Sequence, residues 1–360
     1  MINSILGQYG FTQGTCSVTP FGTGLINNTW LVTHASSKYI LQRINQNVFK
    51  TPADIDDNIK KIAAYLQQHY PAYIFTVPVS TTVNDTLINT DDGAYRMFEF
   101  IEGSRTYDVL QQPQQAYEAA QQFGRFTRLL SGFNAETLNI TLPHFHDLSL
   151  RYTQFLQAVD NGNKERLAHA EPLVQSLKQF NVLVKIFEEI QTNAAFKKRV
   201  THHDTKISNV LFNGLDKGIC VIDLDTVMPG YFISDVGDIM RTYLSPAGED
   251  ETDLEKVHIR DEYFDAVMEG YLGEMNEELS YIEAGAFVYA GEFIIYMQAL
   301  RFLTDYLNND IYYGAKYPLH NYNRAANQIV LLEELVKKEG LFKDKVKKFL
   351  AGKQSPWAIL

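Results

Sequence analysis

The sequence is poor in cysteine, in unbroken apolar runs and in excess positive charge. Only two cysteines, Cys16 and Cys220, occur among 360 residues, so we expect no disulfide framework and a reducing compartment. The most apolar stretch, residues 281–303, is interrupted by charged side chains, which is typical of a buried or amphipathic helix and not of a membrane span. Residues 1–11 contain neither a basic nor an apolar signal segment. These absences predict a cytoplasmic protein that uses no membrane.

Acidic residues outnumber basic ones. Lys and Arg total 32 against 43 Asp and Glu, which gives a net charge of −11. This balance disfavours nucleic acid as a partner, although a local basic site can still bind a small anion. Hydrophobic residues make up 45% of the chain, which is enough for a packed core and too much for an intrinsically disordered chain.

The first hundred residues carry strand signals. Short β-branched and aromatic runs alternate with turn-forming residues, at residues 29–34, 39–44, 75–79, 86–89 and 95–100. One helix interrupts them, because Thr51 and Pro52 form a typical helix start and apolar residues then recur every three or four positions. Beyond residue 111 the apolar spacing becomes helical, and one run extends from Leu173 to Ile190. The sequence therefore predicts an α+β chain.

Two lobes of unequal size are expected from this change of pattern. Residues 1–100 would form a small lobe, an antiparallel sheet plus a helix that binds nucleotide. Residues 101–360 would form a larger helical lobe that carries the catalytic and acceptor residues. The strong strand signal in the second lobe is residues 219–224, and the segment before it, residues 210–220, has the length of a hairpin.

The densest group of chemically useful side chains lies around this hairpin. Asn209 follows Asp204 by five residues, and Asp223 ends the predicted strand. Phosphoryl transfer needs a carboxylate that orients the attacking hydroxyl and accepts its proton, and oxygen ligands for magnesium. We therefore expect Asp204 to be the base and Asn209 and Asp223 to bind Mg²⁺. We assign His202 to holding the loop, and we place Lys206 with the catalytic residues as a cation that helps to bind the polyanionic nucleotide.

A second carboxylate, Asp225, is expected to join the metal site. The order His-x-Asp-x-x-x-x-Asn followed by Ile-Asp resembles the catalytic and metal-binding loops of the aminoglycoside phosphotransferase and choline kinase family. Longer windows are similar to the N-acetylhexosamine 1-kinases of that family, at residues 203–206, 209–211, 222–230, 235–238, 301–307 and 316–321. The similarity runs in order from Pro20 to about Leu332.

This resemblance implies a protein-kinase-like, two-lobed fold. It also implies transfer of the γ-phosphoryl group of ATP to the anomeric hydroxyl of N-acetylglucosamine or N-acetylgalactosamine, with Asp204 as base. Asp235 would brace the catalytic loop. Arg301 and Tyr312 stand where the family places sugar-contacting side chains, and a guanidinium fork and a phenol ring suit sugar hydroxyls.

The acceptor pocket departs from the family at two positions. Leu25 stands where the family has histidine, and Thr242 stands where it has a bulkier apolar residue. A lost donor or acceptor at a sugar hydroxyl costs about 1–3 kcal/mol of discrimination. The preference for an acetamido group is therefore expected to be the property that changes.

The nucleotide is expected to bind between a glycine-containing turn and the hinge. Gly22, Thr23 and Gly24 lie between predicted strands, where backbone amides can approach phosphates. Many kinases carry a phosphate-contacting lysine in the next strand. This chain has Gln42 and Arg43 there, and N-acetylhexosamine 1-kinases also lack that lysine. Phosphate contact is therefore expected from Gln42, Arg43 or the loop amides.

The hinge and the partners complete the sequence-based hypothesis. Backbone groups from Glu99 to Ile101 would pair with adenine. The expected ligands are ATP, Mg²⁺ and a small sugar, and we expect a monomer or weak homodimer that binds no nucleic acid. Three alternatives stay open: a kinase of another sugar, an aminoglycoside or an amino alcohol; a nucleotide-binding regulator without catalysis; and a metal hydrolase built on His144, His146, His202, His203 and Asp204.

Overall fold

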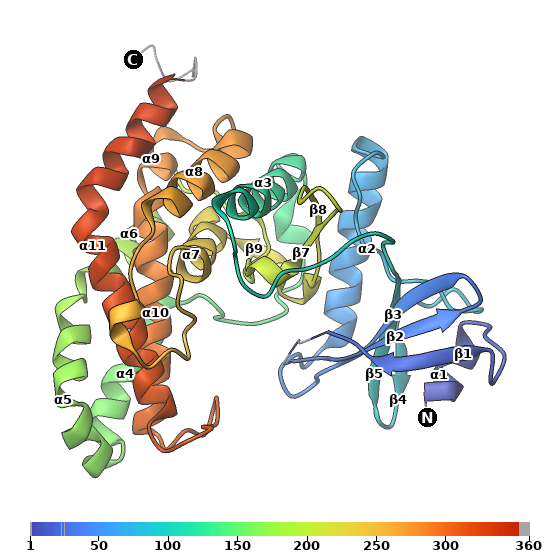
Figure 1. The fold of residues 1–360 in the computed structure, drawn as a ribbon, viewed down its shortest axis with the longest axis horizontal. Coiled ribbons are helices and arrows are strands. Elements are labelled where there is room, and N and C mark those ends of the chain that lie inside the picture. The colour runs from blue at the N-terminus through green and yellow to red at the C-terminus, as the bar shows by residue number, and fades with distance from the viewer. Residues whose placement is uncertain (1, 23, 25, 353–360) are drawn as a thin grey trace.

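Strands gather at the beginning of the chain and helices in the remainder (Figure 1). The structure is a computed structural model that describes residues 2–22, 24 and 26–352. Its smaller lobe is a five-stranded antiparallel sheet in the order β1-β2-β3-β5-β4. The strands and the short helix beside them are β1 (Cys16–Pro20), β2 (Asn28–His34), β3 (Ser37–Ile44), β4 (Ile88–Thr90), β5 (Gly93–Glu99) and α1 (Ile2–Gln8).

One face of the sheet is covered by α1. Ile5 and Leu6 of the helix share a buried cluster with Val32, Leu41 and Met97 of the three central strands. These strand residues lie on one face because side chains alternate along a strand. The register places Gln42 of β3 directly opposite Arg96 of β5. Those two side chains are therefore neighbours on the other face of the sheet.

Helix α2 (Pro52–His69) stands between the sheet and the helical lobe (Figure 1). It begins at Pro52 as predicted, and its stripe of Ile55, Ile59, Ile62 and Leu66 belongs to the large core shared with the helical lobe. Buried Asn58 ties it there, because its Nδ2 donates to the carbonyls of Asn139 (2.9 Å) and Val227 (3.1 Å). Helix α2 thus belongs to the small lobe by sequence and packs on the large lobe. We propose the boundary between the two lobes near residue 100.

The larger lobe is built from helices around a buried central one. The helices are α3 (Pro113–Leu129), α4 (Leu148–Asn161), α5 (Lys164–Gln179), α6 (Val182–Thr192), α7 (Phe232–Tyr243), α8 (Asp261–Met275), α9 (Tyr281–Gly285), α10 (Phe287–Leu307) and α11 (His320–Gly352). Short 3₁₀ turns occur at η1 (Ala135–Thr137), η2 (Ile207–Asn209), η3 (Leu224–Thr226) and η4 (Leu254–Lys256). Nearly every residue of α10 is buried, in agreement with its largely apolar sequence.

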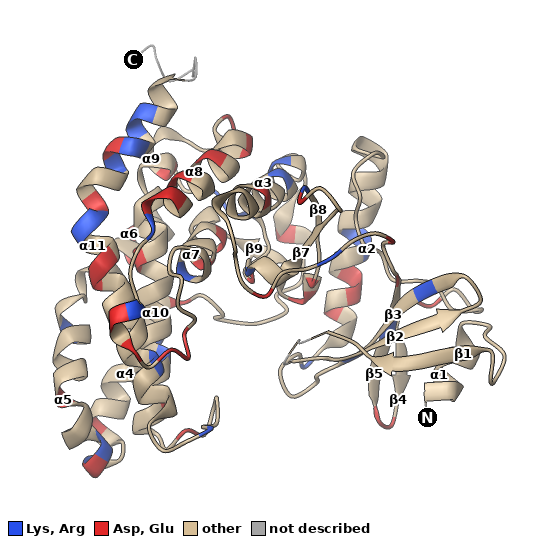
Figure 2. Cartoon of the chain, in the orientation of Figure 1, with Lys and Arg blue, Asp and Glu red and all other residues tan. Residues whose placement is uncertain are grey.

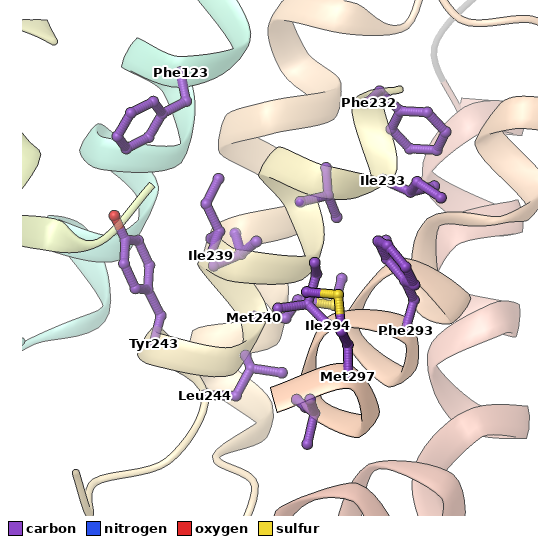
Figure 3. Close-up of a cluster of buried hydrophobic side chains, with 14 of the residues drawn as sticks. Phe123, Phe232, Ile233, Ile239, Met240, Tyr243, Leu244, Phe293, Ile294 and Met297 are labelled. Atoms are coloured by element: carbon purple, nitrogen blue, oxygen red, sulfur yellow. The ribbon is translucent and has the colours of Figure 1, made fainter. Parts of the chain in front are cut away.

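Helix α7 packs closely on α10 (Figure 3). Ile239 and Met240 of α7 meet Ile294 and Met297 of α10 in the buried cluster of the close-up. Gly237 makes the close approach possible, because a Cβ atom there would lie 2.2 Å from the carbonyl oxygen of Ala290. This packing fixes α7, which in turn supports the candidate catalytic loop.

Two small antiparallel pairs frame the candidate site. Strand β6 (Arg199–Thr201) pairs with β9 (Met228–Gly230), and β7 (Val210–Phe212) pairs with β8 (Gly218–Val221). The predicted hairpin over residues 210–220 is confirmed. It returns the chain so that Ile222 donates its amide to the carbonyl of Asn209 at 2.9 Å, which brings Asp223 back to the catalytic loop.

Some predicted elements were wrong. Residues 75–79 form no strand and make only a bridge between Pro78 and Phe98, since proline has no amide to extend a ladder. The helical run from Leu173 to Ile190 divides into α5 and α6. Strand β1 and helix α1 had no clear sequence signal.

The lysines of α11 gather in its C-terminal half (Figure 2). Lys338 pairs with Asp261, and Lys345 pairs with Asp265 at 2.7 Å, so this part of α11 is linked to α8. The pattern is that of a packed helix with a solvated face. Among the described residues, no helix is long and apolar enough to span a membrane.

Candidate active site

The candidate catalytic loop follows β6 and is held by α7. Asp235 of α7 accepts hydrogen bonds from the backbone amides of His202 (3.1 Å) and His203 (2.7 Å). His203 has a left-handed backbone, with φ of 68°, so the chain turns sharply just before Asp204. Burial raises the pKa of Asp235 to about 7, although the two amides oppose that shift. The geometry agrees with the bracing role expected for Asp235.

The two histidines of the loop are buried and bonded to backbone carbonyls. His202 donates from Nε2 to the carbonyl of Ile222 at 3.0 Å. The Nδ1 atom of His203 lies 3.1 Å from the carbonyls of Thr201 and Thr226. Burial lowers the pKa of both rings, that of His203 to about 4. Both are therefore neutral at pH 7, and His202 is in a position to hold the loop against the segment that leads to Asp223.

Three of the predicted residues meet at the carboxylate of Asp204. Its Oδ2 accepts hydrogen bonds from Lys206 Nζ (2.8 Å) and Asn209 Nδ2 (3.0 Å), and Asn209 also donates to the Asp204 carbonyl at 2.8 Å. Burial alone would raise the pKa of Asp204, but the adjacent Lys206 ammonium lowers it below its usual value. The carboxylate is thus ionised at neutral pH, in the form that can accept a proton from a hydroxyl.

Asp223 lies on the opposite side of Lys206. Its carboxylate is 3.9 Å from Lys206 Nζ and is 36% exposed, which leaves oxygen atoms open to solvent. Partial burial and the neighbouring charge of Asp225 raise the pKa of Asp223 to about 7. Its backbone is left-handed, with φ of 63° and ψ of 60°, a conformation that aspartate and asparagine tolerate better than most residues.

These residues suit a hard divalent cation. Mg²⁺ prefers oxygen ligands and keeps several waters, so it needs only one or two carboxylates from a protein. Asp223 offers a partly exposed carboxylate, whose pKa is raised by burial and by the charge of Asp225, and Asn209 adds an amide oxygen next to the predicted base. Within the described part of the chain, no group of three or more His, Cys, Asp or Glu side chains could hold a metal ion.

The histidines of the hydrolase alternative have other partners. His144 is exposed, and its Nδ1 lies 2.9 Å from Asp147. His146 is half-buried, with its ring stacked on Phe145 at 4.4 Å and edge-on to His203 at 5.4 Å. Burial lowers the pKa of His146 well below its usual value. These contacts are those of an aromatic core beneath the loop.

Asp225 is enclosed between the two lobes. It is 1% exposed and accepts hydrogen bonds from Asn27 Nδ2 at 2.7 Å and from the guanidinium of Arg96. Both donors come from the small lobe, since Asn27 lies just after the glycine-containing turn and Arg96 lies in β5. The predicted metal ligand Asp225 is thus a junction between the lobes in this structure.

The two side chains predicted to contact phosphate, Gln42 and Arg43, lie on opposite faces of β3 and have different partners. Gln42 Oε1 accepts two hydrogen bonds from Arg96, from Nε (3.1 Å) and Nη2 (2.9 Å). Arg43 lies on the other side of the strand and pairs with Asp92 in the β4–β5 turn at 3.4 Å. Gly22 has a positive φ of 78°, as expected of a turn glycine, and nothing lies within 4 Å of a Cβ atom built on Gly24. Thr23 and Leu25 lie outside the described residues.

The predicted hinge, Glu99 to Ile101, begins at the last residue of β5. Glu99 and Ile101 line a cavity of about 520 Å³ together with Phe98 and residues 74–80. Phe100, between them, meets the ring of Phe21 edge-on at 6.1 Å. Phe21, directly before the glycine-containing turn, therefore contacts the predicted hinge.

Two of the predicted acceptor residues, Arg301 and Tyr312, lie together on the helical lobe. Arg301 of α10 donates to Tyr312 Oη at 3.4 Å, and its guanidinium lies 5.9 Å from the centre of the Phe145 ring. Phe145 also contacts the ring of His203, at 6.5 Å. Arg301 is therefore separated from the catalytic loop by a single aromatic ring. Thr242 uses its hydroxyl to bond the carbonyl of Asp238 within α7, at 2.7 Å.

The loop that presents Tyr312 is anchored by one carboxylate. Asp305 accepts the backbone amides of Tyr312 (2.7 Å) and Tyr313 (2.9 Å) and the side-chain amide of Asn321 (3.1 Å). The loop turns through left-handed residues at positions 309, 310 and 314. Tyr312 remains 73% exposed, so it is available to an incoming acceptor.

Sequence reasoning missed Arg96, Asn27 and Phe145. Arg96 had a usable signal, because an arginine within the apolar segment of β5 must be paired when buried. Asn27 and Phe145 had none, since an asparagine in a turn and a phenylalanine in a loop are ordinary. Their positions depend on how distant segments pack together.

Comparison with known proteins agrees with this architecture. An aminoglycoside phosphotransferase from Alicyclobacillus acidocaldarius is 15% identical, with 95% of each chain covered and a TM-score of 0.65. Spectinomycin phosphotransferase, in complex with ADP and spectinomycin, is 13% identical, with 94% of this chain and 97% of the other covered and a TM-score of 0.60. A choline kinase from Cryptosporidium parvum is 14% identical, with 97% and 98% covered and a TM-score of 0.58.

These likenesses confirm the predicted protein-kinase-like fold, with a sheet-based small lobe and a helical large lobe. The model of one protein family matches residues 17–275, which is well over half of the chain and includes every predicted catalytic and metal-binding residue. The chain belongs to the phosphotransferase enzyme family.

Proposed function

We propose that this protein is an ATP- and Mg²⁺-dependent kinase that phosphorylates the anomeric hydroxyl of a sugar, with an N-acetylhexosamine as the preferred acceptor. Asp204 accepts the proton of that hydroxyl, Lys206 fixes the carboxylate, and Asn209 and Asp223 are the residues that would hold magnesium. Bound magnesium would neutralise charge on the nucleotide phosphates. The short Lys206–Asp204–Asn209 contacts support this assignment.

The cluster of Arg301 and Tyr312 is our reason for proposing a neutral sugar as the acceptor. Arg301 places a guanidinium one aromatic ring away from the catalytic loop, and Tyr312 lies beside it. A cationic acceptor such as choline or an aminoglycoside would be repelled by that charge. A neutral sugar would instead gain hydrogen-bond donors from Arg301 and a flat phenol face from Tyr312.

Tests of acceptors and of the product decide this proposal. We would assay the purified chain with MgATP and a panel of free hexoses, N-acetylhexosamines, aminoglycosides, choline and aminopropanol. We expect turnover on sugars, highest on an N-acetylhexosamine, and a product whose phosphorus NMR signal shows coupling to the anomeric proton. Phosphorylation at carbon 6, or turnover only on a cationic acceptor, would refute it.

The proposal also covers the cellular compartment and the oligomeric state of the protein. With two cysteines, Cys16 half-buried and Cys220 buried, neither paired in the structure, a reducing cytoplasm suits the protein. We propose a monomer or weak homodimer, which sedimentation of the purified chain would test.

A further inference from the structure

In β3 a glutamine stands where many kinases carry a phosphate-binding lysine, and the positive charge that this glutamine contacts belongs to the neighbouring strand. Gln42 occupies that position in β3, and Arg96 stands directly opposite it in β5. Gln42 Oε1 receives both Nε and Nη2 of Arg96, at 3.1 and 2.9 Å. A bidentate contact of this kind fixes the plane of the guanidinium. Gln42 thus orients a charge from β5, whereas the cations of β3 itself, Lys38 and Arg43, are paired with Glu102 and Asp92.

Arg96 is an unusual residue for its position. Its side chain is only 2% exposed, and a buried guanidinium is costly unless its donors are used. Asp225 neutralises the charge through Nη2, but Nη1 is buried and has no hydrogen-bond partner among the described residues. One nitrogen of an otherwise saturated group is therefore left without an acceptor, and an anionic oxygen would satisfy it.

The surroundings of Arg96 indicate which anion would bind to its Nη1 atom. Its partner Asp225 follows the candidate metal ligand Asp223 by two residues, and the same carboxylate binds Asn27, just after the glycine-containing turn. Arg96 therefore lies where the turn, β3 and the metal-binding segment converge. In a kinase fold that is the region of the nucleotide phosphates.

We propose that Arg96 replaces the missing lysine: it is the cation of the small lobe that binds a phosphate of the nucleotide, through Nη1. This inference rests on the proposed function only in taking ATP as the phosphoryl donor. Arg43, the other candidate, pairs with Asp92 at the far turn of the sheet. Lys206 belongs to the helical lobe, where it holds Asp204.

Binding of ADP to the full chain, measured by titration calorimetry without any acceptor, tests the assignment. Arg96→Gln should weaken binding about tenfold or more, because a charge-assisted contact is lost. Arg96→Lys should fall between this variant and the native chain. Arg128→Gln, which removes a guanidinium paired with Glu274 in the helical lobe, is the matched control and should leave binding unchanged. Native-like binding by Arg96→Gln, or a loss confined to Arg43→Gln, would overturn the proposal.

A second variant separates phosphate binding from neutralisation of Asp225. Arg96→Gln leaves that carboxylate buried and unpaired, so the double variant Arg96→Gln/Asp225→Asn removes both charges and protects the fold, which thermal unfolding would verify. We expect the double variant to bind ADP more weakly than the native chain does, as Arg96→Gln alone does. Recovery of native affinity would mean that Arg96 only balances Asp225, and the proposal would fail.

Titrations repeated in EDTA separate phosphate from metal. A direct contact predicts that Arg96→Gln binds metal-free ADP more weakly than the native chain does. A defect seen only with magnesium would assign the effect to the metal site and contradict the proposal. These outcomes are independent of the acceptor, so a failed sugar assay would refute the proposed function and leave this inference standing.

Discussion

Lys206 Nζ lies between two carboxylates, 2.8 Å from Asp204 and 3.9 Å from Asp223. One ammonium therefore connects the candidate base with the candidate metal ligand. Its own pKa is raised, because these two negative charges outweigh the effect of its burial. Lys206 is therefore protonated at neutral pH, and its positive charge is part of the site.

Asp204→Asn should abolish most phosphoryl transfer without affecting nucleotide affinity. The amide keeps the shape and can still contact Lys206, but it cannot accept a proton in the transition state. We expect kcat to fall by roughly 10²- to 10⁴-fold, with ADP affinity in calorimetry close to that of the native chain. A variant that retains comparable turnover would rule out Asp204 as the base.

Asp223→Asn should change the requirement for magnesium. Asparagine tolerates the left-handed backbone at this position, with φ of 63°, so the loop keeps its shape while the charge is lost. We expect the Mg²⁺ concentration for half-maximal activity to rise about tenfold or more, because a charged ligand is replaced by a neutral one.

A matched control for this variant lies in the β7–β8 turn. Asp216 is also left-handed, with φ of 57°, and Asp216→Asn makes the same chemical change away from the site. Its magnesium curve should overlay that of the native chain. Identical shifts in both variants would show a general electrostatic effect and not a metal site at Asp223.

The catalytic segment could be predicted from sequence because its parts are close along the chain. Asp204, Asn209 and Asp223 are joined by one loop and one hairpin, so their spacing determines much of their geometry. The junction at Asp225 could not be predicted in this way. Its partners Arg96 and Asn27 are 129 and 198 residues distant, and only the packing of the lobes brings them together.

The acceptor cluster illustrates a similar limit. Arg301 and Tyr312 were identified by resemblance, yet their link to the catalytic loop runs through Phe145, an aromatic residue without a motif. At residues 75–79, hydrophobic pattern predicted a strand that Pro78 limits to one bridge. Local pattern therefore predicted the elements of the large lobe better than the contacts between them.

Tyr312→Phe and Arg301→Gln should weaken acceptor binding selectively. Each removes hydrogen-bonding groups from the cluster and leaves the nucleotide side intact, so we expect the KM for the sugar to rise by about tenfold with the KM for ATP unchanged. Tyr281→Phe is the control, because Tyr281 is a similarly exposed tyrosine on α9. Equal effects of Tyr281→Phe and Tyr312→Phe would contradict the acceptor assignment.

Gly237→Ala should destabilise the helical lobe. The added Cβ would lie 2.2 Å from the carbonyl oxygen of Ala290, so α7 and α10 would have to separate, at a cost of about 1–3 kcal/mol or more. Gly340→Ala is the opposite case in α11, because nothing lies within 4 Å of its Cβ, and alanine should stabilise that helix by up to about 1 kcal/mol. Chemical denaturation of both variants would measure the difference, and equal stabilities would argue against the close packing of Figure 3.

Glu292 in α10 should make stability depend on pH. Its side chain is 5% exposed, and Oε1 has no hydrogen-bond partner among the described residues. Burial, together with the charge of Glu339 and against that of Lys343, raises its pKa from 4.5 to about 7. Between these values the folded chain keeps a proton that the unfolded chain has released, so the free energy of unfolding falls as pH rises.

Glu292→Gln tests this dependence, because glutamine cannot ionise. At pH 5 the variant and the native chain should be similarly stable, since the native side chain is then neutral when folded. At pH 8 the variant should be more stable by up to about 3 kcal/mol, the equivalent of the raised pKa. Glu277→Gln, at an exposed position between α8 and α9, should show no such gain. Urea unfolding at both pH values measures the effect, and a Glu292→Gln variant that follows the native pH profile would mean that this carboxyl group is already ionised in the fold.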